Sequence, residues 1–316
     1  MKSKAAVFLS ILVSAFAVNS CAPVSTANLT TPDSTITSVS MQLLQIDTAS
    51  RPDVRVFLSI EDQSDNFLTD FRLGNFSILE DGTPGVPYEV GPVTDPLSVV
   101  IILDRSGSMS ASAGSVTREE ASESAAVSML NAMDTDDAVA LIEFDDEVTT
   151  TYGFTTDKAT VAQTIVANTL GGATAVYDAV YTAAELASGR AGRKLLLILT
   201  DGDDNSSSHT LEEAISRVNL QGVAVYTVGL GTDLNTDALR AIAAQTGAEF
   251  FQSADGTDLS AYFVQVLERM NNLYYVKYRQ RKSGMVRTYL NFGSLTAVAQ
   301  KSFPDPRESE EEETSP

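Results

Sequence analysis

The chain has 316 residues, of which 43% are hydrophobic, and its 42 acidic and 21 basic side chains give a formal net charge of −21. A surface this acidic repels nucleic acid and bare anionic lipid, so the composition argues against a protein that binds either one directly. The length and apolar content suffice for one large hydrophobic core or two smaller ones. Because there is a single cysteine, a disulfide framework is excluded.

Residues 1–20 are typical of a secretory signal peptide. Lys2 and Lys4 precede an apolar stretch at 5–18 that is too short to span a bilayer comfortably. The stretch ends in Val-Asn-Ser-Cys at 18–21, which resembles a bacterial lipobox. Cys21 is the only cysteine and lies where cleavage is expected, so we predict that it carries lipid; the alternative is an ordinary secretory signal with an incidental cysteine.

A lipid anchor determines where the mature chain resides. Acyl chains anchor stably because each buried methylene contributes about 0.8 kcal/mol. By resemblance to the sorting rule of enteric bacteria, Ala22 after Cys21 favours the outer membrane over the inner one. Residues 21–36 are rich in Ser, Thr and Pro and are typical of a flexible tether. We therefore expect a lipid-anchored protein of the cell envelope, facing either the periplasm or the exterior.

Residues 37–95 have the two-residue periodicity of β-strands. Val54, Val56, Leu58 and Ile60 alternate with more polar positions, and the run at 76–79 leads into an Asp-Gly turn. No convincing helix occurs there, and the region is short for a complete β-sandwich. It is therefore predicted to be one part of a split all-β domain.

From 96 to 272, strand and helix patterns alternate, which is the signature of a doubly wound, Rossmann-like α/β domain. The predicted strands are 97–103, 138–144, 147–152, 194–200, 223–229 and 248–252, and the predicted helices are 117–133, 157–168, 176–188, 210–219, 236–246 and 257–272. In the strand order three-two-one-four-five-six, the first and fourth strands are neighbours at the topological switch point, where such folds bind ligands.

The first of these strands ends in a set of oxygen-bearing side chains. Asp104, Ser106 and Ser108 occupy alternate positions, and Gly107 allows a sharp turn between the serines. Carboxylate and hydroxyl oxygens suit a hard divalent cation such as Mg²⁺, which prefers octahedral oxygen coordination. Two later segments have similar chemistry, namely Gly-Gly-Ala-Thr at 171–174 and the strand 194–200 that is followed by Asp201.

Together these three segments resemble the metal-ion-dependent adhesion site of von Willebrand factor A (VWA) domains. The resemblance assigns the metal to Asp104, Ser106, Ser108, Thr174 and Asp201, with the serines as direct ligands and the other three bound directly or through water. Mg²⁺ is the expected ion, with Mn²⁺ and Ca²⁺ as alternatives. Two carboxylates little more than neutralise a divalent ion, so an open position would favour an incoming carboxylate.

Simpler interpretations exist for the same residues. Asp104 and Asp201 could cap helices, although three such loops in this order favour a metal site. Residues 201–212 imitate an EF-hand loop, but Ser206 stands where that loop requires Gly and a strand precedes it. Asp104 could be an aspartyl nucleophile, but Ser106 replaces the second Asp of such phosphatases. Tyr177 and Asp178 are interpreted as structural, and no catalytic residues are predicted.

Two-residue periodicity returns at 273–303, in strands too few to fold alone. We therefore expect them to pair with the strands of 37–95, so that the VWA domain (96–272) is inserted into the split β domain. The stretch Phe-x-Ile-x-Glu-Asp-Gly at 76–82 resembles the segment before the VWA domain of many bacterial VWA proteins. Residues 304–316, with four consecutive glutamates, are predicted to be a disordered acidic tail.

The resemblance implies metal-dependent binding of a protein partner that supplies a Glu or Asp carboxylate. The alternatives are a non-adhesive scaffold or regulatory subunit of an envelope complex, in which the metal is structural, and a metal-dependent hydrolase. Contact with the membrane is expected through lipid only, and none is expected with nucleic acid. Related VWA domains couple binding to movement of the final helix. Here such coupling and a fixed site are equally compatible with the sequence.

Overall fold

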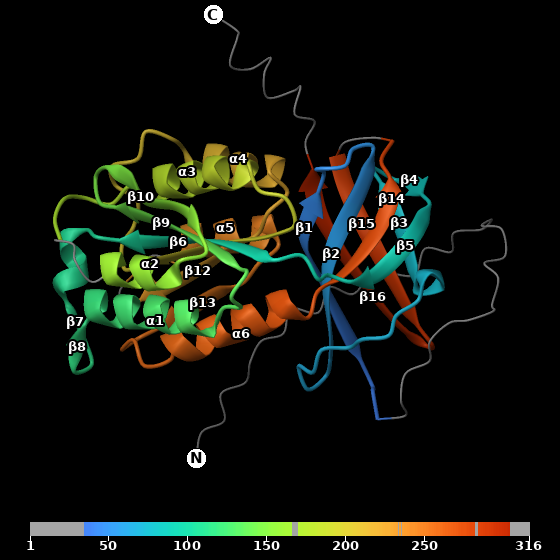
Figure 1. Ribbon diagram of the computed structural model, residues 1–316, viewed down its shortest axis with the longest axis horizontal. Helices are drawn as coiled ribbons and strands as arrows, with labels where there is room; N and C mark the ends of the chain where they lie inside the picture. Colours follow the sequence, from blue (N-terminus) through green and yellow to red (C-terminus); the bar gives the residue numbers. More distant parts are fainter. Residues whose placement is uncertain (1–34, 166–169, 233, 235, 282–283, 304–316) are drawn as a thin grey trace, which may run out of the picture.

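The computed structural model describes residues 35–165, 170–232, 234, 236–281 and 284–303. Figure 1 shows an α/β part beside a part built of strands, joined where β6 enters and α6 leaves the α/β part. Cys21, the signal peptide, most of the tether and the acidic tail lie outside the described residues.

Six strands form the sheet of the α/β part, in the order β10-β9-β6-β11-β12-β13. This is the predicted order, and the two strands expected at the switch point are hydrogen-bonded neighbours. All pairs are parallel except β10 with β9. The strands are β6 (Leu97–Asp104), β9 (Ala138–Phe144), β10 (Val148–Thr155), β11 (Arg193–Thr200), β12 (Val225–Leu230) and β13 (Phe250–Ser253).

Helices cover both faces of this sheet, which explains why β6, β9, β11 and β12 are buried along their whole lengths. Side chains that alternate along β6 enter two separate apolar layers, Val99 and Ile101 on one face and Val100 and Ile102 on the other. The first layer lies under α1 (Arg118–Ala132), α2 (Lys158–Ile165) and α6 (Leu259–Asn271), and the second under α3 (Val176–Ser188), α4 (Leu211–Leu220) and α5 (Asp237–Thr246).

Most element ends fall within two residues of their predicted positions, and α3 coincides with its prediction. Strand β10 continues to Thr155, three residues beyond the predicted end, because its pairing with β9 extends that far through two irregularities of register. Two short paired strands, β7 (Ser112–Ala113) and β8 (Val116–Thr117), precede α1 and were not predicted. The predicted helix residues 166–168 lie outside the described residues.

The other part contains two four-stranded sheets that enclose a common apolar core. One has the order β1-β2-β14-β5, with β1 (Val39–Asp47), β2 (Asp53–Asp62), β14 (Tyr274–Arg279) and β5 (Pro87–Pro92). The other has the order β16-β15-β3-β4, with β16 (Leu295–Phe303), β15 (Gly284–Phe292), β3 (Phe76–Glu80) and β4 (Thr83–Gly85). Residues Leu73–Asn75 form a short 3₁₀ helix, η1, before β3.

Strands from before and after the α/β part share both sheets. Val56 of β2 faces Val276 of β14, and Ile78 of β3 faces Thr288 of β15. Each sheet therefore needs both segments of the chain to complete its pairing. The domain limits of 95 and 273 stay predictions.

The two parts meet at the amino-terminal end of the parallel strands. Leu44 and Phe57, on the outer face of the first sheet, join the apolar layer under α6. The backbone N–H of Ile46 donates to the carbonyl of Gly222 at 2.8 Å. Gly222 has φ +63°, and a Cβ there would collide with the Ile46 carbonyl, so a glycine permits this close approach. Among the described residues, no helix is long and apolar enough to cross a membrane.

Candidate metal centre

The first predicted metal loop begins where β6 ends. Asp104 is the last residue of β6, Ser106 directly precedes the 3₁₀ helix η2 (Gly107–Ser110), and Ser108 lies in that helix. The backbone N–H of Ser106 donates to Oδ1 of Asp104 at 2.7 Å, and the two serine Oγ atoms lie 3.1 Å apart. Asp104 and Ser106 are buried, whereas Ser108 is exposed. The loop thus gathers a carboxylate and two hydroxyls at the surface end of the strand.

The loop after β11 meets the first loop directly. Ser108 donates its hydroxyl hydrogen to Oδ1 of Asp201 at 2.7 Å. The Asp201 side chain has no exposed surface. Since Leu103 of β6 pairs with Leu199 of β11, the parallel register brings Asp104 and Asp201 to the same edge of the sheet. Four of the five predicted site residues are therefore joined by hydrogen bonds or close oxygen contacts.

Thr174, the fifth predicted residue, is held beside them by its backbone. Its N–H donates to Oδ1 of Asn205 at 2.9 Å, and its carbonyl accepts from the Asn205 N–H at 3.0 Å. A Cβ added to Gly202 would lie 3.3 Å from Oγ1 of Thr174, so the hydroxyl is next to the peptide that follows Asp201. The N–H of Gly107 also points to the carbonyl of Gly172, at 3.5 Å. All three loops therefore converge.

Thr200 holds the Asp104 carboxylate through a hydrogen bond, a role that was not predicted from the sequence. Its hydroxyl donates to Oδ2 of Asp104 at 2.5 Å. Burial raises the pKa of Asp104 to about 6, although hydrogen bonds from Ser106 and Thr200 oppose that rise. The sequence did contain a sign of this role, because Thr200 directly precedes Asp201 and is the first polar residue after the aliphatic run 195–199.

Arg118 is the second residue that sequence reasoning missed. It is the first residue of α1, and its Nη1 donates to Oδ2 of Asp201 at 2.5 Å. Asp201 thus accepts from Ser108 with one oxygen and from Arg118 with the other. The two partners are 83 residues apart, so only the fold reveals the pair.

The donor set fits a hard divalent cation. It consists of two carboxylates and three hydroxyls, the oxygen ligands that Mg²⁺ and Mn²⁺ accept. Within the described parts of the chain, no three His, Cys, Asp or Glu side chains cluster closely enough to hold a metal. Any ion at this centre would therefore depend on the serine and threonine hydroxyls as well as on the acids.

The segment after Asp201 packs on the start of α3 and does not form an EF-hand. Asp178, in the first turn of α3, accepts hydrogen bonds from the backbone N–H groups of Ser208 and His209 at 2.9 and 2.8 Å. Asn205 is engaged with Thr174, as described above. Asp178 is thus structural, as expected, and Tyr177 is a partly buried aromatic against the second apolar layer.

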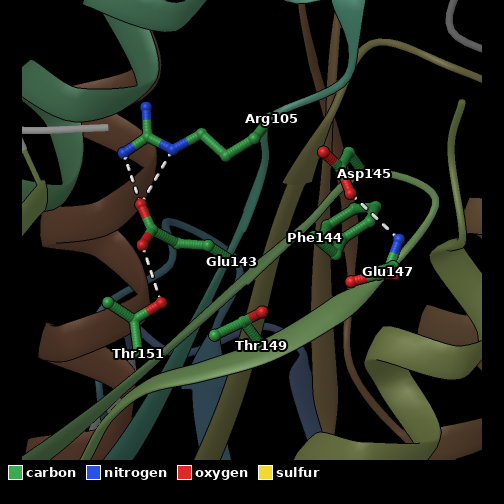
Figure 2. A pocket seen from close by; sticks show the side chains of 7 residues that line it. All are labelled: Arg105, Glu143, Phe144, Asp145, Glu147, Thr149 and Thr151. Atoms are coloured by element: carbon green, nitrogen blue, oxygen red, sulfur yellow. Dashed lines mark hydrogen bonds and ion pairs between the residues drawn. The ribbon is translucent and has the colours of Figure 1, made fainter. Parts of the chain in front are cut away.

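A cavity of about 250 Å³ lies beside the first loop, and Figure 2 shows it. Arg105, the residue after Asp104, extends along it and contacts Glu143 with Nε at 2.8 Å and Nη2 at 2.6 Å. Nη1 bonds Glu123 on α1 at 2.6 Å. Thr151 of β10 donates to the other Glu143 oxygen at 2.7 Å. This network fixes the loop to β9, β10 and α1, and leaves the guanidinium fully engaged.

The order of the strands, the three converging loops and their oxygen-bearing residues are features of VWA domains. Residues 98–265 match the von Willebrand factor type A domain family, and since this is more than half of the chain, the chain belongs to that family.

Individual relatives are distant. A protein of Synechocystis sp., the uncharacterized protein sll0103, is 28% identical over 186 residues, which are 56% of this chain and 42% of that protein. A von Willebrand factor type A structure from Catenulispora acidiphila is similar with a TM-score of 0.52 and 12% identity, over 89% of this chain and 76% of that one. Proximal thread matrix protein 1 from the mussel byssus gives a TM-score of 0.51 and 22% identity, over 61% and 51%. At these identities the structures establish the fold alone.

Proposed function

We propose that this protein captures a protein partner at the bacterial cell envelope through a divalent metal ion, expected to be Mg²⁺, held by Asp104, Ser106, Ser108, Thr174 and Asp201. A carboxylate of the partner, from Glu or Asp, would complete the metal coordination. The observation that carries the proposal is the convergence of the three loops at one edge of the sheet, where Asp104, Ser106, Ser108 and Asp201 are in contact and Oγ1 of Thr174 lies next to Gly202.

Charge supports a carboxylate as the incoming group. The donor set contributes two negative charges, so a divalent ion bound there would be neutralised without becoming anionic. Ser108 and Gly107 are exposed, which leaves this side of the centre accessible to a partner. The three neutral hydroxyls are weak ligands for the ion, and a carboxylate oxygen of a partner would be a stronger one.

The scaffold hypothesis, in which the metal is structural, is less well supported. Asp201 already has a cationic partner in Arg118, and Asp104 has the hydroxyl of Thr200. These bonds give each buried carboxylate a hydrogen-bond partner within the chain, which favours an ion that captures a ligand over an ion that the fold requires.

The proposed location rests on sequence alone. We propose that Cys21 is the lipidated first residue of the mature protein and anchors it, through residues 22–36, at the outer membrane. A Cys21→Ser protein is expected to leave the membrane fraction in a high-salt wash, while the wild type stays. Retention of the variant in the membrane would contradict the anchor.

Partner capture is tested by crosslinked pull-down from envelopes of the source organism, with Mg²⁺ or with chelator. Wild type should retain the same specific protein only with Mg²⁺, and the Ser106→Ala/Ser108→Ala variant should retain none while its melting temperature is unchanged. Collapse of that variant's thermal stability would favour the structural-metal scaffold instead. Turnover of a phosphate or ester substrate that requires Asp104 would favour the hydrolase.

A further inference from the structure

Arg118 occupies an unfavourable place for helix stability. It is the first residue of α1, where the helix dipole favours acidic side chains, and Glu119 and Glu120 follow it. Thr117 and Glu120 already form a capping box there. The positive charge at this position therefore does not stabilise the helix, and its favourable interaction is the bond to Asp201.

The surroundings of Arg118 are shaped to receive its guanidinium. Gly231, directly after β12, is buried with φ +106°, and a Cβ there would lie 2.6 Å from Nη2 of Arg118. Any other residue at 231 would push the guanidinium away. The Arg118 side chain is 21% exposed, whereas that of Asp201 is fully buried. The charge is therefore fixed next to the metal centre and stays partly open to the surface.

We propose that Arg118 determines the ligand specificity of this centre: its fixed positive charge weakens the binding of the metal itself and strengthens the capture of an anionic oxygen ligand by the metal-loaded site. The inference rests on the proposed function. Two aspartates neutralise a divalent ion, so the ion, Asp104, Asp201 and Arg118 would together carry one net positive charge. One partner carboxylate restores neutrality, whereas an amide or hydroxyl ligand does not.

The bond to Asp201 adds a positioning role. Because Arg118 takes Oδ2, the opposite oxygen, Oδ1, is the one that faces Ser108. A bonded carboxylate cannot rotate freely, so the oxygen offered to the metal loops is selected in advance. This part of the inference predicts that an uncharged replacement changes affinities without changing the fold.

The experiment compares the full-length chain with Arg118→Gln, which removes the charge, and Arg118→Lys, which keeps it. Calorimetric titration with Mg²⁺ alone is the first readout. Arg118→Gln should bind Mg²⁺ on the order of tenfold more tightly, the size expected for removing one like charge near a divalent ion in a partly exposed site. Arg118→Lys should stay within about threefold of wild type. Arg287→Gln, which removes the same charge from β15 in the other part of the molecule, should match wild type.

The second readout is acetate binding to the Mn²⁺-loaded protein. It is measured as the decrease in water-proton relaxation when acetate replaces water on the Mn²⁺. Arg118→Gln should need about fivefold more acetate than wild type, so the two affinities change in opposite directions. A purely structural arginine would lower both together.

If Arg118→Gln folds like wild type but binds Mg²⁺ no more tightly than wild type does, the inference is wrong, and the proposed function is unaffected. If Arg118→Gln does not fold, tighter Mg²⁺ binding by Arg118→Lys would equally overturn the inference. Wild type that binds no Mg²⁺ at all would remove both the inference and the proposed function.

Discussion

At the carboxyl end of the parallel sheet, the exposed Ser108 lies at the surface next to the buried Asp104 and Ser106, whereas at the amino end Arg269, Gln45 and Lys301 are all buried and bonded within the chain. Gln45 donates to the carbonyl of Gly192 at 2.6 Å and accepts from the N–H of Lys194 at 2.8 Å. Both ends use buried polar groups. The carboxyl end leaves the hydroxyl of Ser108 exposed, and the amino end joins the two parts of the molecule.

The joining end also bears on movement of the final helix. Arg269 of α6 bonds Glu61 of β2 at 2.9 Å and Glu249 at 2.8 Å. Arg193 donates to the carbonyl of Met270 at 2.9 Å and to Asn271 at 2.8 Å. Axial displacement of α6 would break these buried bonds together, and this favours a fixed centre over one coupled to the helix.

The largest effect of a single substitution is expected at the joining end. Arg269→Met should lower the free energy of unfolding by about 3–5 kcal/mol, because it leaves Glu61 buried without its cation. Denaturant unfolding at pH 7 measures this. Arg279→Met, which removes an ion pair whose arginine is 68% exposed, is the matched control and should cost less than about 1 kcal/mol. If the two variants lost equal amounts of unfolding free energy, the buried ion pair would contribute no more to stability than the exposed one.

At the carboxyl end of the sheet, substitutions in the proposed metal centre should alter metal binding and spare stability. Ser106→Ala/Ser108→Ala should weaken Mn²⁺ binding by at least about a hundredfold, since two of the five proposed oxygen ligands are lost. Titration calorimetry at fixed pH measures the change. Ser110→Ala is the control, because its hydroxyl donates to the Gly107 carbonyl at 2.7 Å and is not a predicted ligand. An unchanged Mn²⁺ affinity in the double variant would contradict the assignment of the centre.

A smaller effect concerns pH at the joining end. Lys301 donates to the carbonyls of Val223, at 2.8 Å, and Thr246, and burial lowers its pKa to about 7. Unfolded chains keep lysine protonated to about pH 10, so above about pH 7 the unfolded state binds more protons than the folded state. The free energy of unfolding should therefore rise with pH, by at most about 1.4 kcal/mol per unit.

In Lys301→Met the free energy of unfolding should no longer rise between about pH 7 and 9. Lys277→Met, which removes a lysine from a partly exposed ion pair with Glu89, should keep the rise. Urea unfolding at several pH values separates the two variants. Parallel curves for Lys301→Met and wild type would show that the amine is not the titrating group.

The sequence identifies the parallel sheet well because its strands are continuous apolar runs. Helix α3 is equally clear, since Ala179, Ala183 and Ala187 recur along one buried face and Gly189 follows. Asp104 and Asp201 could be placed together because the expected strand order makes their strands neighbours. These features depend on periodicity and topology, which a single sequence carries.

Pairings between distant side chains could not be predicted in this way. In β2 the alternation separates Val56 and Leu58, which enter the sandwich core, from Ser59 and Glu61. A polar face usually meets water, yet Ser59 and Glu61 are buried, because Arg269 of α6 covers them. The pair of Arg118 and Asp201 has the same cause. In both cases the arginine lies on another element, far along the chain, and the residues around the acid do not indicate the pairing.

The neighbouring positions of β5 and β14 have a consequence for the order in which the protein folds. Pro92 and Tyr274 are paired across the two strands although 182 residues separate them along the chain. Closing so long a loop is entropically costly and slow for an unstructured chain. Once the α/β part has folded, its two ends emerge together, with the N–H of Val93 bonded to the carbonyl of Leu273 at 2.8 Å. The inserted part then acts like a hairpin turn, and the sandwich is expected to assemble after it.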